Sequence, residues 1–303
     1  FLNKDYIQTL EPRLFYLYVP FTEQRHINTF DAGQYTFTYD QLFRVNRFSG
    51  YDRIGDANHL ALAVTSRFLD GETGEEKMRL SVGQILYFQD RRVPLCKGTL
   101  ENPYCDDEHG IHHDRGNKAI LRGGFVSAKS RVSPIAAQID YQVWPGLNVT
   151  GNLVYDPFLS RWNNGNVNLQ LRLAGENPMV INLNYSYLVN GDTEYIENKK
   201  PSNNPDEREP RKAQTIDLSQ IGGSVGVPLS KNWRALGALR YNLNTTEISS
   251  AYAGVEYESC CWALRLFGGR VVTALDRYNE PQYNQSIFLQ FSFKGLGTVA
   301  SSD

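Results

Sequence analysis

The chain has 303 residues, a formal net charge of -2 and a mean hydropathy of -0.44. This charge argues against a binder of nucleic acid or other polyanions, and no apolar run reaches the roughly 18 residues that a membrane helix needs. The 18 Tyr, 15 Phe and 25 Gly against 2 Met favour strands over a helical core. Aromatic residues also form the interfacial girdles of membrane barrels, so an all-β protein is expected, either soluble or membrane-embedded.

Strands are predicted along the chain by the alternation of apolar and polar residues, because successive side chains of a strand point to opposite faces. In the last of these segments the polar face carries Gln290, Ser292 and Lys294, and the apolar face carries Ile287, Leu289, Phe291 and Phe293. The alternating segments are, in chain order, residues 60–64, 80–88, 135–143, 149–155, 167–173, 179–187, 235–243 and 287–293.

The lengths of the strands and of their connections distinguish a membrane barrel from a soluble sandwich. About 12 strands of roughly 9 to 14 residues are expected, which is the length of tilted strands that cross a bilayer. Short turns alternate with connections that are mostly longer and more polar, as in outer-membrane barrels with periplasmic turns and external loops. We therefore predict an antiparallel transmembrane outer-membrane β-barrel rather than a soluble sandwich or an extended sheet. The short turns are expected near residues 71–76, 144–147, 175–178, 230–233 and 259–262, and the clearest long connections are 21–56 and 190–213.

The two ends of the sequence carry little strand signal, so residues 1–5 and 295–303 are predicted to be tails. The first ten residues lack the basic segment and the apolar segment of a secretory signal. Because an outer-membrane protein must be exported, we expect residues 1–303 to be a portion of a longer barrel protein.

Cys260 and Cys261 are adjacent, in the sequence YESCCWALRLF, at a turn that the strand count places on the periplasmic side. Neighbouring cysteines rarely pair with each other, because the small ring strains both the disulfide and the peptide bond. The other cysteines, Cys96 and Cys105, fall in a long external connection, across a hydrocarbon layer of roughly 30 Å. Cys260 and Cys261 are therefore expected to form disulfides with cysteines outside this sequence. The alternative is a pair of free, buried thiols.

Cys96 and Cys105 enclose the segment CKGTLENPYC, and a local disulfide there would stiffen an exposed loop. A zinc site is the alternative, because His109, His112 and His113 follow closely in the sequence. The spacing matches no standard pattern of zinc ligands, so the disulfide is the preferred hypothesis and no metal is predicted.

Catalytic signatures are missing from the sequence, which has no nucleophile elbow, no HExxH and no phosphate-binding Gly-rich loop. Glu256 and Glu258 lie two residues apart, but at strand spacing we expect them to share the lumen face with Arg240 and Arg265. A surface hydrolase would need a triad that the sequence does not supply. No enzyme activity, catalytic residue or cofactor is therefore predicted.

Four segments resemble consecutive landmarks of the LptD family, in the family's order: TLEPRLFYLYVP, LFRVNRFSGYDRIGDANHLALAVTSRF, RLSVGQILYF and YESCCWALR. The resemblance extends from Asp5 to Leu296 and is weakest in residues 91–118 and 190–213. It implies that residues 1–303 are the C-terminal portion of an outer-membrane barrel domain, preceded in an intact protein by more strands and a periplasmic jelly-roll domain.

The resemblance also implies a function and its partners. Family members receive lipopolysaccharide from a periplasmic Lpt bridge and pass it to the outer leaflet, while a lipoprotein, LptE, plugs the lumen. By resemblance, Cys260 and Cys261 form long-range disulfides to the absent N-terminal region. The last strand, residues 283–294, matches one side of the family's lateral seam. A weakly paired seam lets the sugars of an amphiphile stay in the polar lumen while its acyl chains enter the membrane lipid.

The predicted function is a non-enzymatic translocon subunit whose lumen is lined by Asn, Gln, Arg and Glu. Residues 21–56, rich in Tyr, Phe and Arg, are expected to contact LptE or to plug the lumen; an ordinary external loop is the alternative. A passive porin or the membrane anchor of an autotransported adhesin is the alternative function. Neither accounts for two adjacent cysteines at a periplasmic turn.

Overall fold

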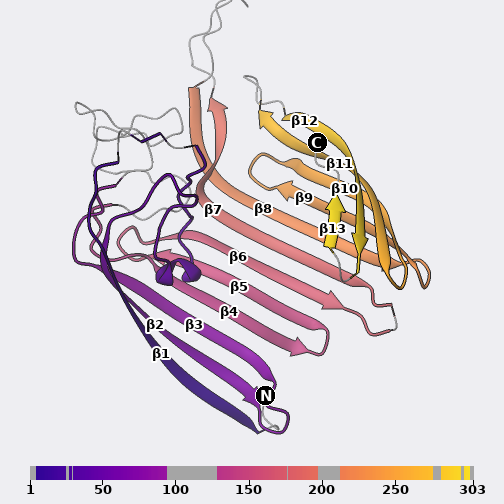
Figure 1. Cartoon of the computed structure of the whole chain (residues 1–303), viewed down its shortest axis with the longest axis horizontal. Coiled ribbons are helices and arrows are strands. Elements are labelled where there is room, and N and C mark those ends of the chain that lie inside the picture. The colour runs from indigo at the N-terminus through magenta and orange to yellow at the C-terminus, as the bar shows by residue number, and fades with distance from the viewer. Residues whose placement is uncertain are drawn as a thin grey trace, which may run out of the picture. The chain divides into compact units, whose positions relative to one another are not determined.

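The computed structural model describes residues 5–24, 27–28, 30–93, 128–175, 177–196, 212–275, 281–294 and 297–300. Over these residues the protein is all-β, apart from the short 3-10 helix η1 (Tyr39–Phe43) in the connection after the first strand (Figure 1). Within this described part, no helix has the length and apolar character needed to cross a membrane.

Thirteen strands in the described part form one sheet, and their order in the sheet is their order in the chain. Every pair whose register is described is antiparallel. The strands are 10 to 17 residues long, except for the four-residue β13. Their bounds are β1 (Tyr6–Val19), β2 (Ala57–Asp70), β3 (Glu76–Tyr87), β4 (Ile135–Trp144), β5 (Leu147–Asp156), β6 (Arg161–Arg172), β7 (Val180–Ile196), β8 (Lys212–Pro228), β9 (Trp233–Asn242), β10 (Glu247–Glu258), β11 (Trp262–Leu275), β12 (Pro281–Phe293) and β13 (Gly297–Ala300).

The C-terminal end differs from the sequence prediction. Residues 297–300, expected to lie in a tail, form β13 and pair with β12 between Gln290 and Phe293. The expectation of a free tail is wrong for these four residues. The physical reason is that the edge of β12 presents backbone N–H and C=O groups, which the backbone of residues 297–300 can satisfy.

The connections confirm the predicted short turns, while the long ones are fewer than expected. The turns after β2, β4, β6, β8 and β10 lie where the sequence placed them. At the opposite strand ends, residues 157–160 and 243–246 are equally short connections. Each contains one residue in the left-handed region, Ser160 (φ 48°) and Thr246 (φ 58°). Among the described connections, residues 20–56 form a long loop as expected. The predicted bounds 190–213 of the other long connection are wrong, because β7 continues to Ile196 and β8 begins at Lys212; the residues between them lie outside the described part.

The chain divides into two compact units, each described here by itself. Unit 1 contains β1 to β3, most of β4 and the connection between β1 and β2; unit 2 contains β8 to β13. Unit 1 comprises residues 1–142, 150–166 and 188–191, and unit 2 comprises residues 143–149, 167–187 and 192–303.

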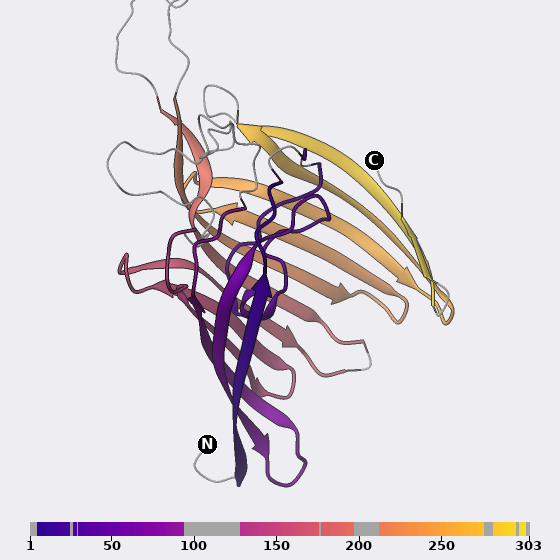
Figure 2. The ribbon, with the colours of Figure 1, turned by 60° about the vertical axis from the view of Figure 1, so that its left-hand side comes forward.

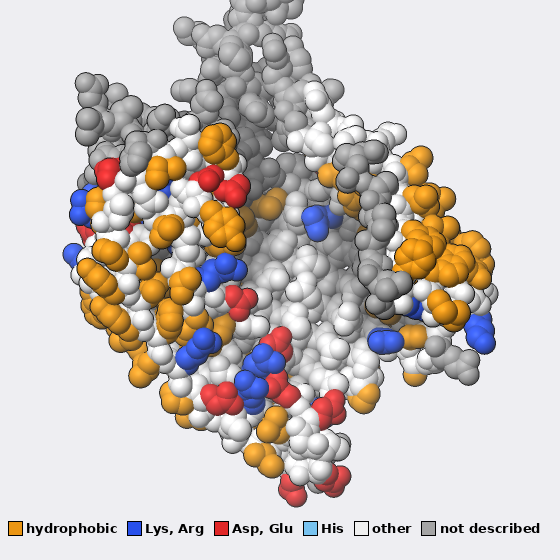
Figure 3. All heavy atoms as spheres, viewed as in Figure 1, with side chains coloured by type: hydrophobic (Ala, Val, Ile, Leu, Met, Phe, Trp, Pro, Cys, Tyr) orange, Lys and Arg blue, Asp and Glu red, His pale blue; other side chains and the backbone are white. Residues whose placement is uncertain are grey.

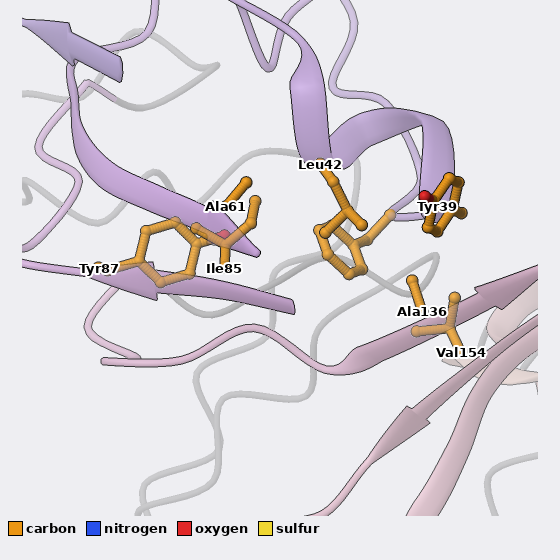
Figure 4. Close-up of a cluster of buried hydrophobic side chains, with 8 residues drawn as sticks. Tyr39, Leu42, Ala61, Ile85, Tyr87, Ala136 and Val154 are labelled. Atoms are coloured by element: carbon orange, nitrogen blue, oxygen red, sulfur yellow. The ribbon is translucent and has the colours of Figure 1, made fainter. Parts of the chain in front are cut away.

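In unit 1, the connection between β1 and β2 lies against one face of β2 and β3 (Figure 1, Figure 2). Leu42 of η1 is completely buried there, beside Ala61 and Ile85 (Figure 4). Gly83 of β3 makes this approach possible, because an added Cβ would lie 2.6 Å from Cδ1 of Leu42. The buried cluster consists of Phe37, Tyr39, Leu42, Ala61, Ile85, Tyr87, Ala136 and Val154.

In unit 2, neighbouring rungs of the sheet carry opposite chemistry, as alternation requires. Val255, Leu266 and Leu289 lie opposite one another on adjacent strands, and all three are exposed. The next rung points to the other face and is polar, consisting of Arg234, Glu256, Arg265 and Gln290. An exposed apolar face opposite a polar one is the pattern of strands with one face toward lipid.

Candidate functional site

The connection between β1 and β2 is fixed by side chains that bond to its own backbone. Arg53 is completely buried, and its guanidinium donates to the carbonyls of Gln24 (2.5 Å) and Ile27 (3.1 Å). The side chain of Asn46 donates to the carbonyl of Arg53 (2.9 Å) and accepts from the backbone N–H of Gly55 (2.9 Å). These bonds satisfy backbone groups that burial would otherwise leave unpaired. A role of residues 21–56 in contacting LptE or plugging the lumen, rather than as an ordinary external loop, stays a prediction; the internal scaffold of the connection was not predicted.

Asp56 joins this connection to the segment that follows β3. Its side chain is 1% exposed and accepts from the backbone N–H groups of Arg92 (2.7 Å) and Val93 (3.0 Å) and from the Arg47 guanidinium (2.9 Å). Burial by itself would raise the pKa of the Asp56 carboxyl. The two N–H donors and the Arg47 charge outweigh burial and hold that pKa below its ordinary value. The carboxylate is therefore ionised at neutral pH.

A ladder of ion pairs crosses β1 to β4 near the strand ends that carry the short turns. Arg67 lies 3.1 Å from Glu11 and 3.2 Å from Glu76. Arg79 lies 2.8 Å from Glu76 and 3.9 Å from Asp140. Figure 3 shows charged side chains of both signs gathered over these strand ends. Each pair is partly exposed and contributes only about 0.2 to 1 kcal/mol, so the main consequence is a strongly hydrophilic face.

A buried carboxylate lies on the polar face of unit 2. Glu256 is 3% exposed and is paired with Arg265 and with Arg234 (3.6 Å). Its predicted neighbours were Arg265 and Arg240. The prediction is confirmed for Arg265 and wrong for Arg240, because the register places Arg234 opposite Glu256 and Arg240 opposite Ser250.

Apolar side chains interrupt the polar face of unit 2, for which the sequence predicts a lining of Asn, Gln, Arg and Glu. Leu236, Tyr252 and Phe267 line a groove of about 480 Å³ on this face. A Cβ added to Gly254 would collide with Phe267, and one added to Gly269 would collide with the Tyr252 ring. The rings thus cover the bare backbone of glycines on the neighbouring strand, which stabilises the sheet.

The cysteine pair lies in the turn between β10 and β11. Cys260 and Cys261 are both free and exposed, with their sulfurs 2.7 Å apart. The turn is closed by a bond from the Ser259 N–H to the carbonyl of Trp262 (2.9 Å). Lys294 joins the turn to β12, since its backbone N–H donates to the Cys261 carbonyl (2.9 Å) and its Nζ to the Ser259 carbonyl (2.7 Å). The alternative of free, buried thiols is wrong in its burial, because both side chains are exposed; the pairing of the two cysteines stays a prediction.

The two thiols are chemically distinct. The contact with Cys261 lowers the pKa of the Cys260 thiol, and the same contact raises the pKa of Cys261. Because the thiolate is the reactive species in thiol–disulfide exchange, Cys260 is the better nucleophile of the two.

Comparison with known proteins assigns the chain to a family. The family model described as LPS transport system D matches residues 1–233. The chain is 43% identical to the LPS-assembly protein LptD of Legionella pneumophila (strain Philadelphia 1) over 298 residues, covering 98% of this chain and 32% of that protein. It is 35% identical to the LPS-assembly protein LptD of Pseudomonas fluorescens (98% and 30% covered) and 32% identical to that of Methylococcus capsulatus (95% and 26%). The chain belongs to the LptD family. It spans between about a quarter and a third of the length of these relatives.

LptD family membership settles the fold class and the location of the chain. The antiparallel sheet is part of an outer-membrane β-barrel, and its strands cross the bacterial outer membrane. The exposed apolar rung of unit 2 accordingly faces lipid.

The strand expected at the seam of an LptD protein is β12. Its apolar residues alternate as predicted, and Ile287 (73%), Leu289 (50%) and Phe293 (49%) are exposed; Phe291 is partly exposed and stacks on Trp262 (5.6 Å). One edge of β12 pairs with β11 along its whole length, whereas β13 covers the other edge only from Gln290 to Phe293. Within the described part of the chain, β12 therefore ends the run of long strands.

The segment with Cys96, Cys105 and the three neighbouring histidines lies outside the described residues. The local disulfide, and the zinc site that competes with it, both stay predictions. In the ranges that the structure describes, no group of three or more His, Cys, Asp or Glu side chains is placed to hold a metal ion.

Proposed function

We propose that this chain is the C-terminal barrel portion of a translocon subunit that inserts lipopolysaccharide into the outer leaflet of the outer membrane. The observation that carries the proposal is the match of 98% of the chain to proteins named LPS-assembly protein LptD. The partners proposed with it are an LptE lipoprotein in the lumen and a periplasmic Lpt bridge that docks on the absent N-terminal domain.

The proposed mechanism uses the two faces of the sheet. Charged and amide side chains on one face hold the sugars of lipopolysaccharide in water, while the exposed apolar face stays in lipid. The seam at β12 provides the exit, because an edge with few strand hydrogen bonds can separate at low cost. The chain contributes surfaces for binding and passage in this mechanism and catalyses no covalent step.

We also propose that Cys260 and Cys261 form disulfides with cysteines upstream of residue 1, which would tie the barrel to the periplasmic domain. The exposure of both thiols supports this proposal. Non-reducing peptide mass spectrometry on the full-length protein from its native membrane tests it. Links from Cys260 and Cys261 to upstream cysteines are expected; free thiols, or links to Cys96 or Cys105, would contradict it.

The transport function is tested by depleting the full-length protein from cells and following newly made lipopolysaccharide. Loss of lipopolysaccharide from the cell surface, with accumulation in the inner membrane, is the expected result. Normal surface lipopolysaccharide together with impaired uptake of small polar solutes would instead indicate a passive porin.

A further inference from the structure

A small cavity lies in unit 1 between residues 20–56 and the polar face of β1, β2 and β3. Its volume is about 70 Å³, and its lining includes His59, Tyr87, Arg44, Arg47 and Arg91. One water needs roughly 10 to 15 Å³ of such space. The cavity therefore has room for several waters or for one group of the size of a phosphate.

His59 lacks a partner in this cavity. The side chain is 8% exposed, and neither Nδ1 nor Nε2 has a hydrogen-bond partner among the described residues. Its ring packs edge-on against Tyr87, with centroids 5.7 Å apart. A buried polar group without a partner costs about 1 to 3 kcal/mol, so native proteins almost always supply one. The side chains around His59 do not supply it, which indicates a bound group.

The charges around the cavity indicate the sign of that group. Asp56 is the single carboxylate among the described lining residues, and it is already held by Arg47 and by two backbone N–H groups. Three guanidinium groups, those of Arg44, Arg47 and Arg91, are in the same lining, so its formal charge is positive. Arg44 is exposed, stacks over the Tyr35 ring at 4.0 Å and has no carboxylate partner among the described residues. Stacking uses the face of a guanidinium and leaves its N–H edge able to bind an oxyanion.

We propose that this cavity binds a phosphate-type oxyanion through His59 and Arg44. This rests on the proposed function in one respect: the phosphate group belongs either to the transported glycolipid or to a free phosphate ion. A neutral imidazole has one donor and one acceptor, so its partner must accept at one atom and donate at another. A hydrogen phosphate, or a sugar phosphate beside a hydroxyl, does both, whereas chloride leaves one nitrogen unpaired.

Arsenate locates the site, because it scatters anomalously and, like phosphate, keeps a protonated oxygen near neutral pH that can donate to one nitrogen of His59. Crystals of the full-length protein with its lumen partner would be soaked in arsenate. An anomalous peak within hydrogen-bond distance of a His59 nitrogen and of Arg44 is expected. Ordinary water density in the cavity, without an anomalous peak, would overturn the proposal.

Binding in solution is measured by the thermal unfolding of the same complex in inorganic phosphate and in chloride at equal ionic strength. A ligand that binds only the folded state raises the unfolding midpoint as its concentration rises. Arg44→Gln should weaken phosphate binding at least about tenfold, the loss expected for one charge-assisted hydrogen bond. His59→Phe keeps the ring against Tyr87 and should abolish binding. Because Arg44 is exposed, Arg44→Gln remains informative if His59→Phe does not fold.

Arg131→Gln is the matched control, because Arg131 is exposed in the same unit, pairs with Asp90 (3.8 Å) and does not line the cavity. Equal phosphate stabilisation in the wild type, Arg44→Gln and Arg131→Gln would refute the site.

A competition experiment distinguishes the two sources of the phosphate group, the glycolipid and the free ion. Lipopolysaccharide is added as a competitor, either intact or after a phosphatase has removed its phosphate groups. If only the intact form displaces phosphate, the site belongs to the glycolipid. If neither form displaces phosphate, the site belongs to the free ion.

The proposed anion site and the proposed transport function can be refuted independently. If the cavity holds no anion while cells still deliver lipopolysaccharide to their surface, the site is refuted and the function stands. Arsenate in the cavity of a protein that does not deliver lipopolysaccharide would keep the site and remove the function.

Discussion

At the scale of single residues, the lowered pKa of the Asp56 carboxyl makes the attachment of residues 20–56 depend on pH. The pKa of its carboxyl is lowered in the folded protein, so the folded state binds fewer protons than the unfolded chain near that pKa. The stabilisation is fully present above the ordinary carboxyl pKa and is lost as the pH falls through the folded one. The attachment of residues 20–56 should therefore weaken in acid.

We expect proteolysis or hydrogen exchange within residues 20–56 to accelerate as the pH falls below about 4. Asp56→Asn should accelerate both already at neutral pH, because it removes the charge that Arg47 faces, and it should flatten the pH dependence. Asp90→Asn is the control, since Asp90 is half-exposed and only 3.8 Å from Arg131. An unchanged acid response in Asp56→Asn would assign the effect to another carboxyl.

A second prediction at this scale concerns the order in which the thiols react. The contact between the sulfurs lowers the pKa of Cys260 and raises that of Cys261, so Cys260 is the first of the two to form a thiolate as the pH rises. In the reduced full-length protein, iodoacetamide should modify Cys260 several-fold faster than Cys261. Peptide mass spectrometry over a time course measures both rates. Equal rates, or a faster Cys261, would contradict the prediction.

At the scale of strands, the rung of Arg234, Glu256 and Arg265 joins β9, β10 and β11. Removing the buried carboxylate of Glu256 leaves two guanidinium groups, 27% and 47% exposed, without their counter-charge. The loss of unfolding free energy in Glu256→Ala, measured by urea titration, should therefore exceed the about 1 kcal/mol of an exposed pair and stay below the about 3 to 5 kcal/mol of a fully buried one. The partner for comparison is Glu258, which is 45% exposed in its pair with Lys294 (2.7 Å).

Glu258→Ala should cost less than about 1 kcal/mol, because exposed ion pairs are screened by solvent. Folding in detergent micelles, followed by gel mobility and tryptophan fluorescence, compares the two variants. Equal losses from Glu256→Ala and Glu258→Ala would mean that burial of the rung does not govern its strength.

The rung of Arg234, Glu256 and Arg265 also shows what the sequence can and cannot predict. Alternation along one strand predicts which residues share a face, and it placed Ile287, Leu289, Phe291 and Phe293 on one side of β12 as the structure does. It cannot predict which residues meet across strands, because register depends on turns and on packing between distant segments. Arg240 was therefore expected where the structure has Arg234.

The cavity at His59 also could not be predicted from the sequence. Its walls come from η1, β1, β2 and β3, and they meet only because Gly83 admits Leu42 and Asp56 binds the segment after β3. Each of these contacts joins residues far apart in the chain. The richness of residues 21–56 in Tyr, Phe and Arg was the one available signal, and it indicated a functional loop without its fold.

At the scale of the whole molecule, membership of the LptD family and the two-faced sheet together predict which side chains meet lipid. Leu239 and Ala238 are neighbours on β9 but belong to opposite faces. Leu239 is 49% exposed and lies opposite Ala251, whereas Ala238 lies opposite Tyr252 on the polar face. A lysine at the first position must enter hydrocarbon, and a lysine at the second remains in the polar interior.

Leu239→Lys should destabilise the barrel by about 2 to 4 kcal/mol near the bilayer midplane, since a lipid-facing charge cannot be hydrated there. Ala238→Lys should cost markedly less, limited to the strain of fitting a longer side chain. The free energy of unfolding of both variants is measured by reversible urea titration of the full-length protein in lipid vesicles. If instead Ala238→Lys were the more damaging change, the polar face would be the one in contact with lipid. An opening at the seam beside β12 would then not bring the sugars to a polar lumen and the acyl chains to lipid, so the proposed route for lipopolysaccharide would be refuted as well.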